Sequence, residues 1–411
     1  MQPPTQRSAK QPPNKLRPFQ NAAPISPEKK ASLAMAAPES SLPKNFSWRD
    51  KNSDNVTLTG VIDQKQCGNC WAVSTIQSLT DRVSVARARR APGFQDIGNG
   101  GVLSVAWMTS CNDYCAGDND KCSSACEGAD IGTALKFLAL DIFEGGVPYA
   151  SCVPTMTQQE MEALNQKFSE TLRKCQNNTT VAGKECLAAQ RSCGACITNG
   201  SNVYVRRDSV SKLTDIVAAK QDIFLNGPVT AGFQVFADIF EKGKEFPPFQ
   251  DTDGVYVYDG KAESSGYHAV SIVGWGEKTI KLNGVPTLVP FWEVRNSWGT
   301  EWGDQGFWKH AMRDTRKNIN VAAGMEGTLD FPPMGGIISF QADVRKNPGT
   351  APVAQKRENY GTSDAASTSD AASTSEEKSG FNVYMAILLV LCLASVGVLV
   401  FLVRRRQKLS K

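Results

Sequence analysis

The sequence predicts an α+β protein in which a helical half is followed by a β-rich half, with one transmembrane helix near the C-terminus. Three observations lead to this prediction. Apolar side chains recur at helical spacing after Trp71, and short runs rich in Val, Tyr and Phe alternate with glycines between Val203 and Trp308. Residues 381–403 contain no charge. The two periodicities distinguish helices from strands, and we expect a cleft between the two halves.

Length and composition agree with a folded domain. The chain has 411 residues, of which 41% are hydrophobic, so it can bury a sizeable core. The net charge is only +4, and the basic excess lies in the first forty residues and after Val403. Because no basic patch lies in the centre of the chain, we do not expect nucleic acid as a partner.

The two ends of the chain differ from its centre. Residues 1–41 are rich in Pro, Gln, Ser and Lys, which predicts a disordered, pro-segment-like stretch and not a secretory signal peptide. Residues 42–330 carry the regular apolar pattern of the folded body. Residues 347–380 repeat the hexapeptide Ser-Asp-Ala-Ala-Ser-Thr and are rich in Ser, Thr, Ala, Asp and Glu. This composition predicts a flexible stalk.

Residues 381–403 predict a single-pass membrane anchor, because a bilayer requires about 20 apolar residues. A buried core helix is the alternative, but a polar stalk precedes the run and the chain ends soon after it. The basic tail, residues 404–411, predicts a cytosolic C-terminus and a folded body on the exoplasmic or luminal side. The missing signal peptide argues instead for a cytosolic body, so the orientation stays open.

The cysteines favour disulfides over a metal site. Of the twelve, Cys392 lies in the apolar run, and if Cys70 is a free thiol the other ten can form five disulfides in an oxidising compartment. The alternative is zinc, because Cys193 and Cys196 have C-x-x-C spacing and the spacing of Cys122 and Cys126 is close to it. No histidine lies nearby, so we expect neither a metal nor another cofactor. The ten are Cys67, Cys111, Cys115, Cys122, Cys126, Cys152, Cys175, Cys186, Cys193 and Cys196.

Cys70 and His268 are the candidate catalytic pair. A thiol is a useful nucleophile as its thiolate, and both a helix N-terminus and a neighbouring imidazolium lower its pKa. Cys70 stands at the first turn of the helix predicted over residues 71–85. The chain has two histidines. His268 stands at the start of a predicted strand between glycines, whereas His310 is expected to be a surface strand residue.

Four sequence blocks make the chain resemble the papain-like cysteine peptidases, and the blocks occur in the same order as in that family. The resemblance covers residues 42–330, and Asn226-Gly-Pro-Val with Gly254-Val-Tyr makes the cathepsin B branch the nearest. It implies the papain-like fold, with a helical left half, a β-barrel-like right half and the active-site cleft between them. The blocks are Leu42-Pro-Lys-Asn-Phe-Ser-Trp-Arg, Cys67-Gly-Asn-Cys70-Trp, His268-Ala-Val with Gly274-Trp-Gly, and Asn296-Ser-Trp-Gly-Thr-Glu-Trp-Gly.

The resemblance implies a role for each catalytic residue. Cys70 attacks the peptide carbonyl to give an acyl-enzyme, and His268 holds the proton and then donates it to the leaving amine. Asn296 orients the imidazole, and Trp298 shields their hydrogen bond from water. Gln64 supplies a donor to the oxyanion beside the backbone N–H of Cys70. The expected substrates are proteins or peptides.

The resemblance also implies structural and substrate-binding positions. Cys67 pairs with Cys126 in the family. Ala129 replaces the second glycine of the family's substrate-binding pair, and Thr328 falls near the floor of the main specificity pocket, where the cathepsin B branch has a glutamate. A neutral floor predicts a preference for apolar side chains over arginine. The implied substrate-binding residues are Gly68, Gly128, Ala129, Trp298 and Thr328.

Spacing departs from the family, because His268 follows Cys70 by 198 residues where about 130 to 150 are typical. We expect insertions at residues 112–124 and 155–199. The second contains no histidine where the cathepsin B branch has an occluding loop with a histidine pair, which predicts endopeptidase action. Two alternatives are a catalytically silent papain-like binding module on a membrane and a structural membrane protein. The complete catalytic set argues against both.

Overall fold

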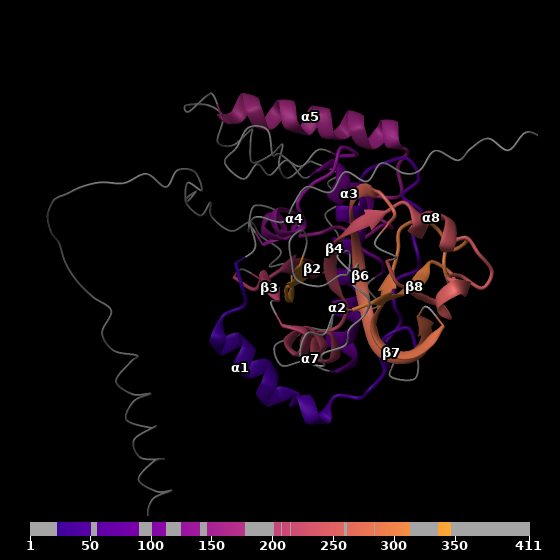
Figure 1. Ribbon diagram of the computed structural model, residues 1–411. Coiled ribbons are helices and arrows are strands. Elements are labelled where there is room, and N and C mark those ends of the chain that lie inside the picture. The colour runs from indigo at the N-terminus through magenta and orange to yellow at the C-terminus, as the bar shows by residue number, and fades with distance from the viewer. Residues whose placement is uncertain are drawn as a thin grey trace, which may run out of the picture. The chain divides into compact units, whose positions relative to one another are not determined.

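A computed structural model shows a mixed sheet with helices packed around it (Figure 1). It describes residues 23–50, 56–89, 101–111, 125–139, 146–176, 201–206, 208–213, 215–258, 261–282, 284–312 and 336–346. The helices are α1 (Pro27–Ala36), α2 (Cys70–Ala88), α3 (Val105–Ser110), α4 (Ile131–Leu138), α5 (Gln158–Gln176), α7 (Ile216–Asn226) and α8 (Asp238–Lys242), with 3-10 turns η1 (Glu39–Ser41) and η3 (Gln250–Thr252).

The strands form one large sheet and one small one. The large sheet has the order β3-β9-β4-β6-β7-β8-β5, with β1 paired to β6, and the small sheet pairs β10 with β2. The strand pairs of the large sheet are antiparallel except β5 with β8. The strands are β1 (Phe46–Ser47), β2 (Ser201–Val205), β3 (Ser211–Leu213), β4 (Val229–Phe236), β5 (Val255–Tyr256), β6 (Ser264–Leu282), β7 (Val285–Arg295), β8 (Phe307–Ala311), β9 (Gly336–Ser339) and β10 (Ala342–Lys346).

Helix α2 lies between the two halves. It begins at Cys70, as its helical spacing predicts, and it is buried along most of its length. One core cluster joins α2 to α3 and α4, and a second lies between the sheet and α7. The α+β prediction of a helical half followed by a β-rich half is therefore confirmed for the described residues.

The central hairpin is longer than its apolar pattern indicates. Strands β6 and β7 have 19 and 11 residues, and Leu282 pairs with Val285, so two residues connect them. In the outer part of β6 the exposed Lys278, Thr279 and Lys281 interrupt the apolar sequence, which is why a search for apolar runs stops near Trp275. The hairpin matters for function because β6 carries His268 and β7 leads directly into Asn296.

The N-terminal segment differs from its predicted disorder in its described part, residues 23–41. Ser26 caps α1 by accepting a hydrogen bond from the Lys29 N–H at 3.2 Å, and Pro27 occupies the first helical position. Helix α1 lies along the outer side of α7 (Figure 1), and Leu33 in this helix and Ile25 just before it are buried. Composition alone did not show these contacts, because the partners of α1 come almost 200 residues later in the chain.

The folded body also extends beyond the predicted limits of 42 and 330. Strands β9 and β10 pair with β3, β4 and β2, so residues 336–346 complete both sheets. The predicted insertion at 112–124 lies outside the described residues. Within the insertion predicted at 155–199, the described part contains α5, which packs against α3.

The predicted membrane location requires correction. Among the residues that the structure describes, no helix is both long and apolar enough to cross a bilayer. Helices α2 and α5 each have 19 residues, but α2 contains the charged pair Asp81 and Arg82, and charged side chains are costly in hydrocarbon. The predicted stalk, anchor and basic tail (347–380, 381–403 and 404–411) lie outside the described residues. The single-pass location and the luminal placement of the body thus have no structural support.

Candidate active site

Cys70 is the first residue of α2 and a free thiol. Its side chain is fully buried where α2 meets β6. The backbone N–H groups of Ala269, Trp71 and Cys70 itself all face the sulfur and lower its pKa. Because Ala269 follows His268 in β6, the fold brings the sulfur next to the strand that carries the imidazole.

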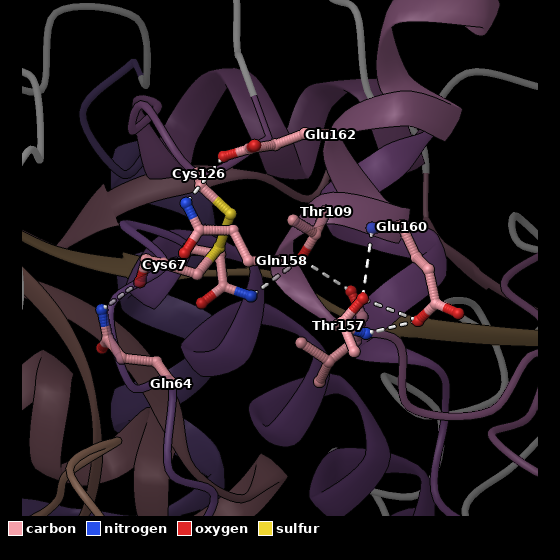
Figure 2. Close-up of a disulfide and its surroundings, with 10 residues drawn as sticks. Gln64, Cys67, Thr109, Cys126, Thr157, Gln158, Glu160 and Glu162 are labelled. Carbon is pink, nitrogen blue, oxygen red and sulfur yellow. Dashed lines mark hydrogen bonds between the residues drawn. A yellow bond between two sulfur atoms is a disulfide. The ribbon is translucent and has the colours of Figure 1, made fainter.

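A disulfide fixes the loop in front of α2. Cys67 is bonded to Cys126, as the family resemblance implied, with an S–S distance of 1.98 Å. Figure 2 shows Gln64 beside this bridge, with its Nε2 donating to the Cys67 carbonyl at 2.8 Å. Its Oε1 accepts a hydrogen bond from Ser297 Oγ at 2.5 Å. Both ends of the buried Gln64 amide are therefore held, and one Nε2 hydrogen remains for another acceptor.

Asn296 determines which nitrogen of His268 carries the proton. The Ser297 N–H donates to Asn296 Oδ1 at 2.8 Å, which identifies that atom as the oxygen. His268 Nε2 lies 2.8 Å from the same oxygen and must therefore be the protonated nitrogen. The neutral ring consequently keeps its lone pair on Nδ1, which has no hydrogen-bond partner among the described residues.

An aromatic cluster covers the histidine. Trp298 stacks on His268 with ring centroids 4.7 Å apart, and Phe240 stacks on Trp298 at 5.0 Å. Phe233, on β4, is paired with His268 in the sheet and approaches its ring edge-on at 5.9 Å. His268 and Asn296 are buried beside these rings, and the shielding of their hydrogen bond by Trp298 stays a prediction.

Burial favours the uncharged forms of both candidate catalytic groups. It raises the pKa of the Cys70 thiol from 9.0 to about 11, against the effect of the nearby N–H groups. It lowers the pKa of His268 from 6.5 to about 4, although the hydrogen bond to Asn296 raises that pKa. The structure therefore holds a thiol and a neutral imidazole at pH 7.

The implied substrate-binding residues are partly assembled. The Gly68 N–H donates to the Cys126 carbonyl at 2.9 Å. Gly128 has a φ of 98°, a conformation that favours glycine, and Ala129 packs in the same cluster as Cys70. Trp298 is half-buried over His268. Thr328 lies outside the described residues.

Two expectations about the site differ from the structure. Cys70 and His268 were expected to line a cleft, but each is 0% exposed. A cavity of about 560 Å³ lies elsewhere, lined among others by Arg49, Glu293 and Lys309, and none of the predicted site residues lines it. His310 was expected at the surface but is buried, and its Nδ1 accepts a hydrogen bond from Trp308 Nε1 at 3.2 Å.

The cysteines near the site answer part of the zinc question. Cys126 is bonded to Cys67, and Cys111 and Cys152 are disulfide-bonded as well. Among the described residues, no group of His, Cys, Asp or Glu could hold a metal ion. Cys122, Cys193 and Cys196 lie outside the described residues.

Sequence reasoning missed Ser297 and Phe233. Ser297 lies inside the Asn296 block and links Gln64 to Asn296, so its place between two candidate residues was an available signal. Phe233 pairs with His268 across β4 and β6, and no feature of its local sequence marks it.

The chain is similar to known cysteine proteases. A family model described as papain family cysteine protease matches residues 42–327. Cathepsin B-like cysteine proteinase 1 of Haemonchus contortus is 27% identical over 297 residues, covering 71% of this chain and 73% of that protein. Cathepsin B-like cysteine proteinase 5 of Caenorhabditis elegans is 27% identical over 292 residues, covering 69% and 74%. The solved structure of proCathepsin B S9 from Trypanosoma congolense is similar at 21% identity and a TM-score of 0.44, covering 80% of this chain and 87% of that one.

Proposed function

Because the chain belongs to the papain family of cysteine proteases, we propose that it hydrolyses peptide bonds through Cys70, His268 and Asn296. One observation supports this assignment above the others. The bond from His268 Nε2 to Asn296 Oδ1 leaves the lone pair on Nδ1, and the Cys70 thiol faces the next residue of the same strand. Nδ1 is therefore the ring nitrogen that can accept a proton.

The first half of the proposed reaction forms a thioester. The Cys70 thiol proton moves to His268 Nδ1, and Sγ bonds to the carbonyl carbon of the substrate while the carbonyl electron pair moves to oxygen. The N-terminus of α2 and the Ala269 N–H favour the thiolate, and Asn296 favours the imidazolium. His268 then gives its proton to the amine nitrogen as the C–N bond breaks.

The second half releases the acid. Nδ1 of His268 takes a proton from water, the water oxygen attacks the thioester carbon, and Sγ leaves and recovers the proton. In both halves the developing oxyanion would accept hydrogen bonds from the Cys70 backbone N–H and from the remaining Nε2 hydrogen of Gln64. The bonds of Gln64 to Cys67 and Ser297 hold that amide in position before the substrate arrives.

Covalent labelling tests the nucleophile. A peptidyl epoxide should label the full chain once per molecule under reducing, mildly acidic conditions, and Cys70→Ala should abolish the label without changing the thermal melting temperature. Labelling that persists in Cys70→Ala, or its absence from a folded wild-type protein, would favour the silent binding module instead.

We also propose endopeptidase action and a preference for apolar side chains. Support comes from the absence of histidine in residues 155–199 and from the neutral Thr328. An internally quenched peptide with a C-terminal amide should be cut as fast as its free-acid form, whereas removal of C-terminal dipeptides needs the free acid. Peptides with Leu or Arg two residues before the cleaved bond should favour Leu. A clear preference for Arg would contradict the second proposal.

A further inference from the structure

Two consecutive charged residues of α2 are buried and paired with partners on different elements. Asp81 accepts a hydrogen bond from Arg295, with Nη2 and Oδ2 2.7 Å apart, and both side chains are 0% exposed. Arg82 contacts Asp222 on α7, with Nη2 and Oδ2 2.5 Å apart, and these side chains are 2% and 0% exposed. Both are therefore buried Asp–Arg pairs with one member on α2, but one connects α2 to β7 and the other connects it to α7.

Arg295 lies directly before Asn296 at the end of β7. Its Nη1 donates to the carbonyl and the Oγ1 of Thr59 at 2.9 and 2.8 Å, and the Thr59 N–H donates to Asp81 Oδ1 at 2.7 Å. The three residues form a closed, buried network. This network joins the helix that begins at Cys70, the segment that leads to Gln64, and the strand that delivers Asn296.

The residues after Arg295 all contact the candidate site. Asn296 holds His268, Ser297 holds Gln64, and Trp298 stacks on His268. The positions of the side chains of residues 296–298 therefore depend on where the backbone leaves β7. The ion pair between the Arg295 guanidinium and Asp81 connects that point to α2.

We propose that the Asp81–Arg295 pair is a positioning device for Asn296, and through it for the proton on His268. This inference rests on the proposed function, since it assigns a task to the Asn296–His268 bond. A shift of about 1 Å remote from the chemistry can lower a rate by about 10²-fold. Since Asn296 stabilises the charged imidazolium, its displacement should also change the pH at which activity is lost.

The matched experiment compares Asp81→Asn with Asp222→Asn. Each substitution keeps the shape of the side chain and removes one buried charge from a pair anchored on α2. We expect comparable losses of melting temperature. Asp81→Asn alone should lower kcat/KM on a fluorogenic peptide by about 10- to 10²-fold. It should also shift the acidic limb of the kcat/KM profile to lower pH, because the neutral His268 imidazole gains its proton only at lower pH once Asn296 stabilises the imidazolium less.

A second pair of variants keeps the test decisive if Asp81→Asn does not fold. Asp81→Leu with Arg295→Met, and Asp222→Leu with Arg82→Met, remove both charges of each pair, a change that proteins often tolerate. Equal kcat/KM and equal acidic limbs in the two double variants would overturn the inference. So would a fall in kcat/KM for Asp81→Asn without a shift of the acidic limb.

Epoxide labelling separates this inference from the proposed function. If wild-type Cys70 is not labelled, the proposed function fails and the pair has no catalytic task. If wild-type Cys70 is labelled and the Asp81 and Asp222 variants are labelled at equal rates, the proposed function survives and the positioning role is wrong.

Discussion

His268 and His310 occupy similar surroundings, but different ring nitrogens make their hydrogen bonds to Asn296 and Trp308. They lie on β6 and β8, both are buried, and their rings approach Phe233 at 5.9 and 5.3 Å. In His310 the Nδ1 lone pair is taken up by the Trp308 indole N–H. In His268 the bond to Asn296 uses Nε2, and Nδ1 has no hydrogen-bond partner in the part of the chain that the structure describes. Burial and aromatic neighbours therefore do not identify a proton acceptor, whereas the position of the remaining lone pair does.

The largest expected effect is the loss of activity when the His268 ring is removed. His268→Ala should lower kcat on a peptide substrate by roughly 10²- to 10⁴-fold, the range for a lost general acid–base group, while the protein remains folded. Steady-state kinetics with circular dichroism as the folding control would measure it. If His268→Ala retained activity within a factor of ten of the wild type, the lone pair on Nδ1 would not identify the proton acceptor.

Stability should depend on pH through His268. Its pKa is about 4 in the folded protein and 6.5 in the absence of burial. Above pH 6.5 neither the folded nor the unfolded protein binds the proton, so His268 does not lower the free energy of unfolding. As the pH falls from 6.5 to 4 only the unfolded chain binds it, and on the order of 3 kcal/mol is lost.

Urea unfolding between pH 7 and 4 would measure this loss. In His268→Gln, which cannot be protonated, the dependence should be weaker by that amount. A wild-type curve and a His268→Gln curve with the same pH slope would show that the imidazole is not held neutral.

Asn296→Ala should have a smaller effect than loss of the ring. Without Oδ1 the ring can rotate, and either nitrogen can carry the proton, so we expect kcat/KM to fall by about 10²-fold. Asn296→Gln, which keeps the amide but displaces it, is the matched control and should recover little of the loss. Recovery to wild-type activity in Asn296→Ala would mean that Trp298 stacking alone orients His268.

The smallest effect is expected at His310. His310→Phe removes the acceptor of the Trp308 indole N–H and leaves that donor buried, which costs about 1–3 kcal/mol. Urea unfolding should show this loss, and kcat/KM should stay within a few-fold of the wild type. A hundredfold loss of activity would instead join the two histidines into one functional unit.

The sequence predicted the local parts of the site better than its long-range contacts. The start of α2 followed from helical spacing, and the Cys67–Cys126 bridge followed from the family resemblance. The burial of His310 was predictable in principle, because Trp308 and His310 are two residues apart in β8 and therefore lie on the same face of the strand.

Other features depend on partners far along the chain. Asp81 meets Arg295 across 214 residues, and Lys29 donates to the Ser209 carbonyl across 180. No local pattern of one sequence identifies such partners. For the same reason the ordering of residues 23–41 could not be predicted from their composition.

Residues 23–41 have a practical consequence for making the protein. The Ile25 N–H and the Ala23 carbonyl take up both backbone groups of Lys212 in β3, at one end of the large sheet. A recombinant form started at Leu42 would leave these groups unpaired and would uncover the apolar side of α7. An open strand edge next to an apolar surface promotes aggregation, so expression trials should keep this stretch.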